Sequence, residues 1–171
     1  GSGPNDLCVP EFRWGTSTAT MLPVRLAVIG AGLVGKTHAE LIAAHSSCVL
    51  VGICDVDPGR QSIARELDSP FYSDVEDLIE QEAPQGAIVS TPNGDHASVA
   101  EICGRRSVHV LIEKPMVCGV GNALATAAIS KKKRVHYMIH YQRHFEPRFF
   151  KARQLILKGT IGEVKSFYVY M

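Results

Sequence analysis

From residue 25 onward, short apolar runs rich in β-branched residues alternate with longer stretches in which apolar residues recur every three or four positions. The short runs are typical of strands buried on both faces, and the longer stretches of helices that pack on a sheet. Parallel strands need a crossover, usually a helix, so this alternation predicts an α/β fold with a doubly wound parallel sheet. The predicted strands are residues 25–29, 49–54, 71–72, 86–90, 108–112 and 135–140, and the predicted helices are residues 33–45, 58–67, 74–81, 95–103 and 122–132.

Individual residues predict how these helices begin and which way they face. We expect Leu41 and Ile42 to point from the first helix toward the sheet. Pro58 suits the first turn of the second helix, where its missing N–H costs nothing. Ser73 or Asp74 is the expected N-cap of the third helix, because a side-chain oxygen there can accept a hydrogen bond from the first turn.

The two ends of the chain differ from this pattern. Residues 1–20 have no sustained period and begin like an expression scar, so we expect a leader before a natural start at Met21; Phe12 and Trp14 leave open a leader that docks on the domain. The doubly wound domain is predicted over residues 21–145. Residues 146–171 predict a linker helix, over 146–157, and an alternating strand, over 164–170, which we interpret as the start of a truncated second α/β domain because a lone strand has no partner.

The composition favours a small-molecule partner. The 18 basic and 17 acidic side chains nearly cancel, which disfavours nucleic acid or an anionic membrane, and no apolar run is long enough to span a bilayer. We interpret the basic run 131–134 as a solvated helix end rather than a nucleic-acid patch. The five cysteines are scattered without Cys-x-x-Cys spacing, which disfavours a disulfide framework and favours a reducing, cytoplasmic location.

The strongest local motif is Gly30-Ala31-Gly32-Leu33-Val34-Gly35, which follows a predicted strand and opens a helix. Such a loop lets the backbone approach a pyrophosphate, and the helix N-terminus supplies free N–H donors, so the motif predicts a Rossmann-type dinucleotide site. Asp55 follows the second strand, where a carboxylate can bind both ribose hydroxyls and repel a 2′-phosphate. NAD is therefore favoured over NADP, with Arg60 as the residue that can accommodate a 2′-phosphate in the alternative.

Polar residues also follow the predicted strands 86–90 and 108–112. Thr91, Asn93 and His96 are expected near the cofactor; the alternative is a proline turn with Asn93 or Asp95 as a helix cap. A lysine in the sequence Glu113-Lys114-Pro115, beside a cofactor, suits proton transfer with a substrate hydroxyl; the alternative is a surface Glu–Lys pair that contributes little.

Three histidines at intervals of four residues are a further feature of the chain, at positions 136, 140 and 144. On a helix they would resemble metal ligands. In a strand over residues 135–140, however, His136 and His140 share a face and no carboxylate is placed to complete a site, so we expect no metal.

Taken together, four segments resemble the glucose-fructose oxidoreductase, inositol dehydrogenase and rhizopine-catabolism family (Gfo/Idh/MocA). The segments are AVIGAGLVGKTHAELI, STPNGDHASVA, LIEKPM, and HYQRHFEPRF followed by LKGTIGEV, and the resemblance runs from about Leu22 to the end of the chain. The sequence departs from the family pattern after Met116, where Gly119 and Gly121 weaken the expected helix start.

The resemblance implies a set of cofactor contacts and a role for Lys114 between nicotinamide and substrate, often with a cis bond before Pro115. It also implies a second domain with an acidic residue and a proton-accepting histidine, and this chain ends before both. The implied cofactor contacts are Gly30, Ala31, Gly32, Leu33, Val34, Gly35, Asp55, Thr91, Asn93, His96, Glu113 and Lys114, with Arg143 near the domain junction.

The sequence therefore predicts an NAD(P)-dependent dehydrogenase that transfers hydride between nicotinamide and a secondary alcohol of a sugar, polyol or related molecule. We expect the chain to bind NAD but to turn over little by itself, and the intact protein to be a homo-oligomer. The alternative is a non-catalytic dinucleotide-binding sensor or regulatory module, which would have no need of a lysine at position 114.

Overall fold

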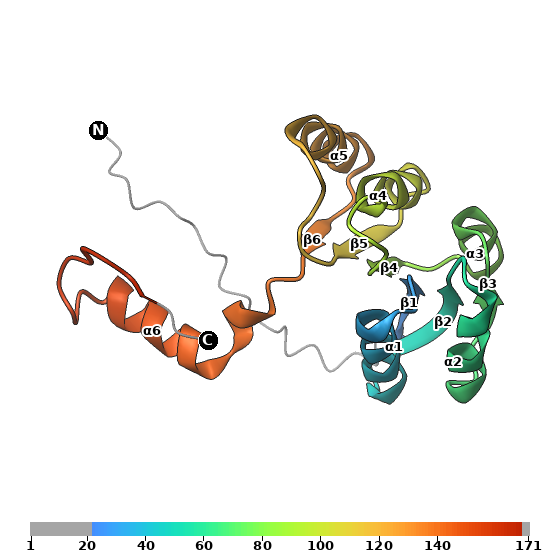
Figure 1. Ribbon diagram of the computed structural model, residues 1–171, viewed down its shortest axis with the longest axis horizontal. Coiled ribbons are helices and arrows are strands. Elements are labelled where there is room, and N and C mark those ends of the chain that lie inside the picture. The colour runs from blue at the N-terminus through green and yellow to red at the C-terminus, as the bar shows by residue number, and fades with distance from the viewer. Residues whose placement is uncertain (1–21, 169–171) are drawn as a thin grey trace.

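The computed structural model describes residues 22–168 and contains one six-stranded sheet. Every neighbouring pair of strands is parallel, and the order is β3-β2-β1-β4-β5-β6 (Figure 1). This is the strand order of a Rossmann fold, so the predicted doubly wound sheet is confirmed. The strands are β1 (Val24–Ile29), β2 (Cys48–Cys54), β3 (Phe71–Tyr72), β4 (Gly86–Val89), β5 (His109–Ile112) and β6 (Tyr137–Ile139).

Helices lie on both faces of the sheet (Figure 1). Buried side chains of α1 and α2 pack on one face, those of α3 and α4 pack on the other, and α5 lies against α4. The last helix, α6, extends away from the sheet (Figure 1). The helices are α1 (Leu33–Ala44), α2 (Gln61–Glu66), α3 (Val75–Glu82), α4 (His96–Arg105), α5 (Val120–Lys133) and α6 (Pro147–Leu157), with 3-10 turns η1 (Pro58–Arg60) and η2 (Gln142–Phe145).

The core consists of two apolar clusters separated by the sheet. Alternate residues of each strand point to opposite faces, so Ala27 and Ile29 of β1 belong to one cluster and Val28 to the other. The last three residues of β1, the last five of β2 and all of β4 are buried, which explains why these sequences are continuous apolar runs rather than alternating ones. This packing fixes the carboxyl ends of the strands, where the site residues begin.

The predicted buried face of α1 is wrong at one of its two residues. Leu41 is 63% exposed, whereas Ile42 is buried as expected. The buried residues of α1 are Gly35, His38, Ala39 and Ile42, at intervals of three and one, which is the spacing of a single helix face. A polar residue, His38, therefore lies on the buried face among small and apolar residues.

The helix starts follow the predicted capping chemistry in part. Asp74 caps α3 by accepting hydrogen bonds from the N–H groups of Glu76 and Asp77. Pro58 begins the 3-10 turn η1, which leads into α2. The glycines after Met116 do not prevent α5, which begins at Val120 directly after Gly119 with φ +88°.

The two ends of the chain are only partly described. The predicted leader, residues 1–20, lies outside the described residues, as do residues 169–171. The predicted strand over 164–170 is not formed at residues 164–168, because a strand needs a hydrogen-bonded neighbour as well as an alternating pattern. Between residues 22 and 168, no helix combines the length and the apolar character that crossing a membrane requires.

Candidate functional site

Most of the predicted site residues lie along one edge of the sheet, because they follow the carboxyl ends of its strands. Gly30 follows β1, Asp55 follows β2, and Glu113 follows β5. Thr91 lies two residues after β4. Strand order reverses between β1 and β4, and in doubly wound sheets this switch point opens the crevice in which ligands bind.

The first part of the site is a glycine loop closed against the end of β4. Gly30 has φ +91°, and a Cβ there would lie 2.6 Å from the backbone of Ser90 and Thr91. A Cβ on Gly35 would lie 1.8 Å from the Gly30 carbonyl oxygen. The Ser90 hydroxyl donates to that same oxygen at 2.8 Å. Side chains larger than hydrogen are therefore excluded at both glycines.

The middle of the loop is open. A Cβ on Gly32 would meet nothing within 4 Å, and Gly32, the N-cap of α1, offers no side chain to its first turn. Helix N-termini carry unpaired N–H groups and partial positive charge, which favour a phosphate group. The loop therefore leaves space beside the first turn of α1, and the pyrophosphate predicted there stays a prediction.

Asp55 closes the loop from the β2 side and is half-buried. Its Oδ2 accepts a hydrogen bond from the Ala31 N–H at 2.6 Å, and its Oδ1 accepts one from the Asp57 N–H at 2.8 Å. A carboxylate oxygen can accept more than one hydrogen bond, so each retains capacity for a ribose hydroxyl. Arg60 is paired with Asp57, with 3.4 Å between Nε and Oδ2.

The loop after β4 contains a buried hydroxyl without a partner among the described residues, and the helix that follows it begins with a buried histidine. His96 is 1% exposed, and its ring nitrogens lie 2.8 Å from the Pro115 carbonyl oxygen and 2.9 Å from the Thr91 carbonyl oxygen. The imidazole thus links this loop to the one after β5. Thr91 Oγ1 is buried and makes no hydrogen bond within the described chain, so it is available to a ligand.

The rest of this loop is a turn in which the predicted cap is not formed. The Asp95 N–H donates to the Pro92 carbonyl at 2.9 Å, as in the proline turn that was one alternative. Asp95 is at the N-cap of α4, but its side chain accepts no hydrogen bond from the first turn. Asn93 is exposed in the turn, and its backbone carbonyl accepts a hydrogen bond from the Cys118 thiol at 3.6 Å.

The Glu113-Lys114-Pro115 segment has the cis bond that the resemblance implied, between Lys114 and Pro115. Lys114 is exposed, and the Glu113 carboxylate pairs with two histidines, His38 and His140, instead of with the lysine ammonium. Burial acts to raise the pKa of Glu113, but the hydrogen bonds from the two imidazoles outweigh it and hold the pKa below its ordinary value. The alternative of a surface Glu–Lys pair is therefore not what the structure shows.

Arg143 lies apart from the other predicted residues. It is in η2 and exposed, and its guanidinium carbon lies 5.5 Å from the centre of the Phe149 ring. This cation–π contact links η2 to α6 rather than to the sheet edge.

The buried cysteines of the domain are protonated thiols. Burial raises the pKa of both Cys54 and Cys103 to about 12, so neither is a thiolate at neutral pH. The four cysteines within residues 22–168 are all free, as the scattered spacing predicted.

Sequence reasoning missed two residues that organise the site, His38 and Ser90. It also missed the contact of His140 with Glu113. Spacing marks His38, since it lies three residues after Gly35 and four before the buried Ile42. The expectation that His136 and His140 share a strand face is wrong, because β6 ends at Ile139. His136 stacks on His109, with ring centres 5.1 Å apart, whereas His140 bonds to Glu113.

Comparison with known proteins identifies the family of this domain. Residues 24–141 match the family described as "Oxidoreductase family, NAD-binding Rossmann fold" (GFO_IDH_MocA). Inositol 2-dehydrogenase of Rhizobium meliloti is 29% identical over 147 residues, which cover 84% of this chain and 44% of that protein. UDP-N-acetylglucosamine 3-dehydrogenase of Acidithiobacillus ferrooxidans is 33% identical over 79% of this chain and 46% of that protein.

A solved structure shows the same fold. Scyllo-inositol dehydrogenase from Lactobacillus casei, with bound NAD(H) and scyllo-inositol, matches with a TM-score of 0.78 and 23% identity over 82% of this chain and 43% of that one. The chain thus spans less than half the length of these relatives. From the match over residues 24–141, the chain belongs to the Gfo/Idh/MocA family of oxidoreductases, whose nucleotide-binding domain is an NAD-binding Rossmann fold.

Proposed function

We propose that this domain binds NAD for a dehydrogenase that transfers hydride between the nicotinamide and a secondary alcohol of a polyol or sugar. The observation that carries the proposal is that the glycine loop, Asp55, Thr91 and Lys114 share one sheet edge at the switch point. Relatives named inositol 2-dehydrogenase and UDP-N-acetylglucosamine 3-dehydrogenase support this class of substrate.

Three features of the chain would hold the dinucleotide. The open position at Gly32 and the N–H groups of α1 suit the pyrophosphate, and Asp55 suits the ribose hydroxyls. A hydroxyl or carbonyl of the cofactor would give the buried Thr91 Oγ1 the partner it lacks within residues 22–168. Once bound, NAD supplies the hydride acceptor or donor of the reaction.

The same residues support NAD rather than NADP. A 2′-phosphate would face the Asp55 carboxylate, and like charges at close range cost several kcal/mol. Arg60 is the residue that could offset this repulsion, but its guanidinium is already paired with Asp57.

Lys114 is the residue proposed to act on the substrate. Its side chain is exposed at the sheet edge, two residues after the end of β5. An ammonium in that position can donate a hydrogen bond to a substrate hydroxyl and assist transfer of its proton to a base.

Isothermal titration calorimetry of the chain with NAD+ and with NADP+ tests this proposal. We expect NAD+ to bind more tightly, and we expect Asp55→Asn to reduce that preference at least about 10-fold, because it removes the charge and keeps an acceptor oxygen. Arg60→Gln tests the alternative in which Arg60 accommodates a 2′-phosphate, and it should leave the preference unchanged because the guanidinium is paired with Asp57. Equal affinity for both cofactors would contradict the role of Asp55, and no binding of either would contradict the proposed function.

A further inference from the structure

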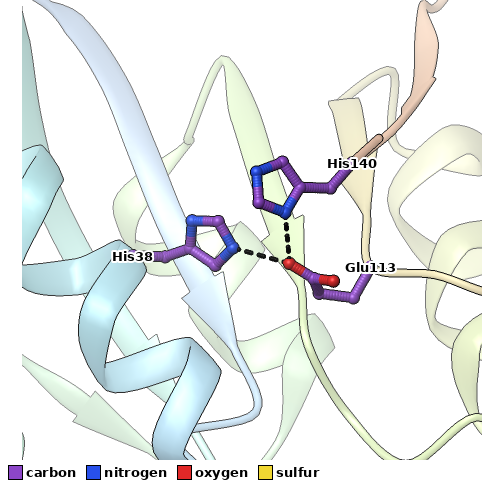
Figure 2. Close-up of side chains that lie close together, drawn as sticks. All are labelled: His38, Glu113 and His140. Carbon is purple, nitrogen blue, oxygen red and sulfur yellow. Dashed lines mark hydrogen bonds and ion pairs between the residues drawn. The ribbon is translucent and has the colours of Figure 1, made fainter. Parts of the chain in front are cut away.

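At the β5–β6 side of the site, one carboxylate lies between two imidazoles (Figure 2). His38 Nε2 is 2.9 Å and His140 Nδ1 is 2.5 Å from the same atom, Glu113 Oε1. The two rings also meet edge to face, with centres 4.8 Å apart. We call these three residues the His–Glu–His cluster.

The distances indicate hydrogen bonds rather than a metal site. The cluster has the ligand types that zinc prefers, and its ligand atoms lie within 4.8 Å of one another. Around a tetrahedral zinc ion with bonds of about 2.0–2.1 Å, however, ligand atoms are roughly 3.3 Å apart. The spacings of 2.5 and 2.9 Å are shorter and are those of N–H···O⁻ bonds.

The chemistry of a carboxylate then fixes the donors. An ionised Glu113 has no proton, so the proton in each bond is on the imidazole: His38 donates from Nε2 and His140 from Nδ1. The other oxygen, Oε2, accepts the backbone N–H of Lys114 at 3.3 Å. Both oxygens of Glu113 therefore have donors, and one donor is the peptide of the proposed substrate-contacting lysine.

The cluster connects three segments that are far apart in the sequence. His38 is in the helix that follows the glycine loop, and Glu113 directly follows β5. His140 is the first residue after β6 and lies immediately before the segment that leaves the sheet through η2 to α6 (Figure 1). Its N–H donates to the Ile112 carbonyl at 2.8 Å, so its backbone is fixed beside Glu113.

Burial strengthens these bonds. The side chains of His38, Glu113 and His140 are 10%, 13% and 29% exposed, so water competes little for the carboxylate. Two imidazole donors offset the cost of burying this charge, which is why the pKa of Glu113 remains below its ordinary value. Without one of them the carboxylate would lose a donor that solvent cannot fully replace.

We propose that His140 is a positioning residue: through its hydrogen bond to Glu113 it couples the segment leaving the nucleotide-binding domain to the nicotinamide end of the cofactor site. It acts by fixing the Glu113 carboxylate, which in turn holds the Lys114 peptide. The structural part of this inference stands by itself, and the cofactor part rests on the proposed function.

The first test, made without cofactor, measures how strongly His140 stabilises the ionised Glu113 carboxylate. The side-chain carboxyl carbon of Glu113 is followed by NMR against pH in the full chain and in three variants. We expect Glu113 to titrate at higher pH in His140→Phe than in the unmodified chain, because the carboxylate has lost one stabilising donor. We expect His140→Asn, whose amide nitrogen occupies nearly the place of Nδ1, to restore the original titration. His136→Phe is the matched control, since that ring stacks on His109.

The second test measures NADH affinity, by fluorescence titration, in the same four proteins. We expect about a 10-fold loss in His140→Phe, within the usual range for coupling between sites, and recovery in His140→Asn. An unchanged Glu113 titration in His140→Phe would contradict the claim that His140 stabilises the Glu113 carboxylate. A changed titration with unchanged NADH affinity overturns the coupling. Failure of the unmodified chain to bind NADH would contradict the proposed function. The carboxyl titration would still show whether His140 stabilises the Glu113 carboxylate.

Discussion

On the β1–β2 side of the sheet edge the site is formed mostly by backbone, whereas on the β5–β6 side it is formed by side chains from distant segments. The glycine loop closes on itself and on Ser90, and Asp55 binds the Ala31 N–H. The other side depends on a carboxylate that His38 and His140 hold. The first side should therefore respond to added atoms, and the second to changes in charge and hydrogen bonding.

Gly35→Ala should have the largest effect on stability. Its Cβ would lie 1.8 Å from the Gly30 carbonyl oxygen, so loop and helix must separate. We expect a loss of about 3 kcal/mol or more in the free energy of unfolding, at the upper end for overpacking. Urea denaturation followed by circular dichroism measures it. A loss below about 1 kcal/mol would contradict the tight closure of the loop.

Gly32→Ala should instead affect binding and leave stability nearly unchanged, because its Cβ would meet no protein atom within 4 Å. The added methyl group occupies the space assigned to the pyrophosphate. We expect NAD affinity to fall by about 30-fold, or roughly 2 kcal/mol. Calorimetry on this variant separates the two glycines: normal NAD affinity would place the cofactor elsewhere.

Glu113→Gln tests the side-chain half through its pH dependence. The pKa of Glu113 is lowered by folding, so its ionised form contributes stability above the ordinary glutamate pKa, and this is lost as pH falls through the lower folded value. At pH 7 we expect the variant to be less stable by roughly 1.5 kcal/mol, since bonds to a charged acceptor are stronger. Both proteins retain His38 and His140, so the difference between their unfolding curves should shrink in acid. A pH-independent difference would contradict this account.

Asp74→Ala removes a helix cap that lies outside both sides of the site, and it should destabilise the protein less than Gly35→Ala or Glu113→Gln. Asp74 accepts hydrogen bonds from the first turn of α3, at 2.8 and 3.1 Å, and losing such a cap costs about 1 kcal/mol. Ser73→Ala, at the other position considered as a cap, should leave the melting temperature unchanged. A larger effect for Ser73 would mean that the cap is misassigned.

The same contrast explains how far the sequence predicts this molecule. The sheet, the glycine loop and Asp55 depend on neighbouring residues or on one strand–helix unit, and local patterns predict them. The His–Glu–His cluster needs three segments to meet, and its members have no mutual spacing that marks a contact. His140 also illustrates a boundary effect, because alternation within a strand says nothing of a residue after the strand ends at Ile139. Leu41 shows that apolar character alone does not decide which helix face is buried.

The most direct test of the central claim is an NMR titration of the ¹⁵N-labelled chain with NAD+. If one cofactor lies across the switch point, the amide signals of Gly32, Thr91 and Lys114 should shift with a single midpoint, while that of Lys132, at the far end of α5, stays unchanged. Shifts at Gly32 without any at Thr91 and Lys114, or no saturable shifts at all, would contradict a dinucleotide site along this edge of the sheet.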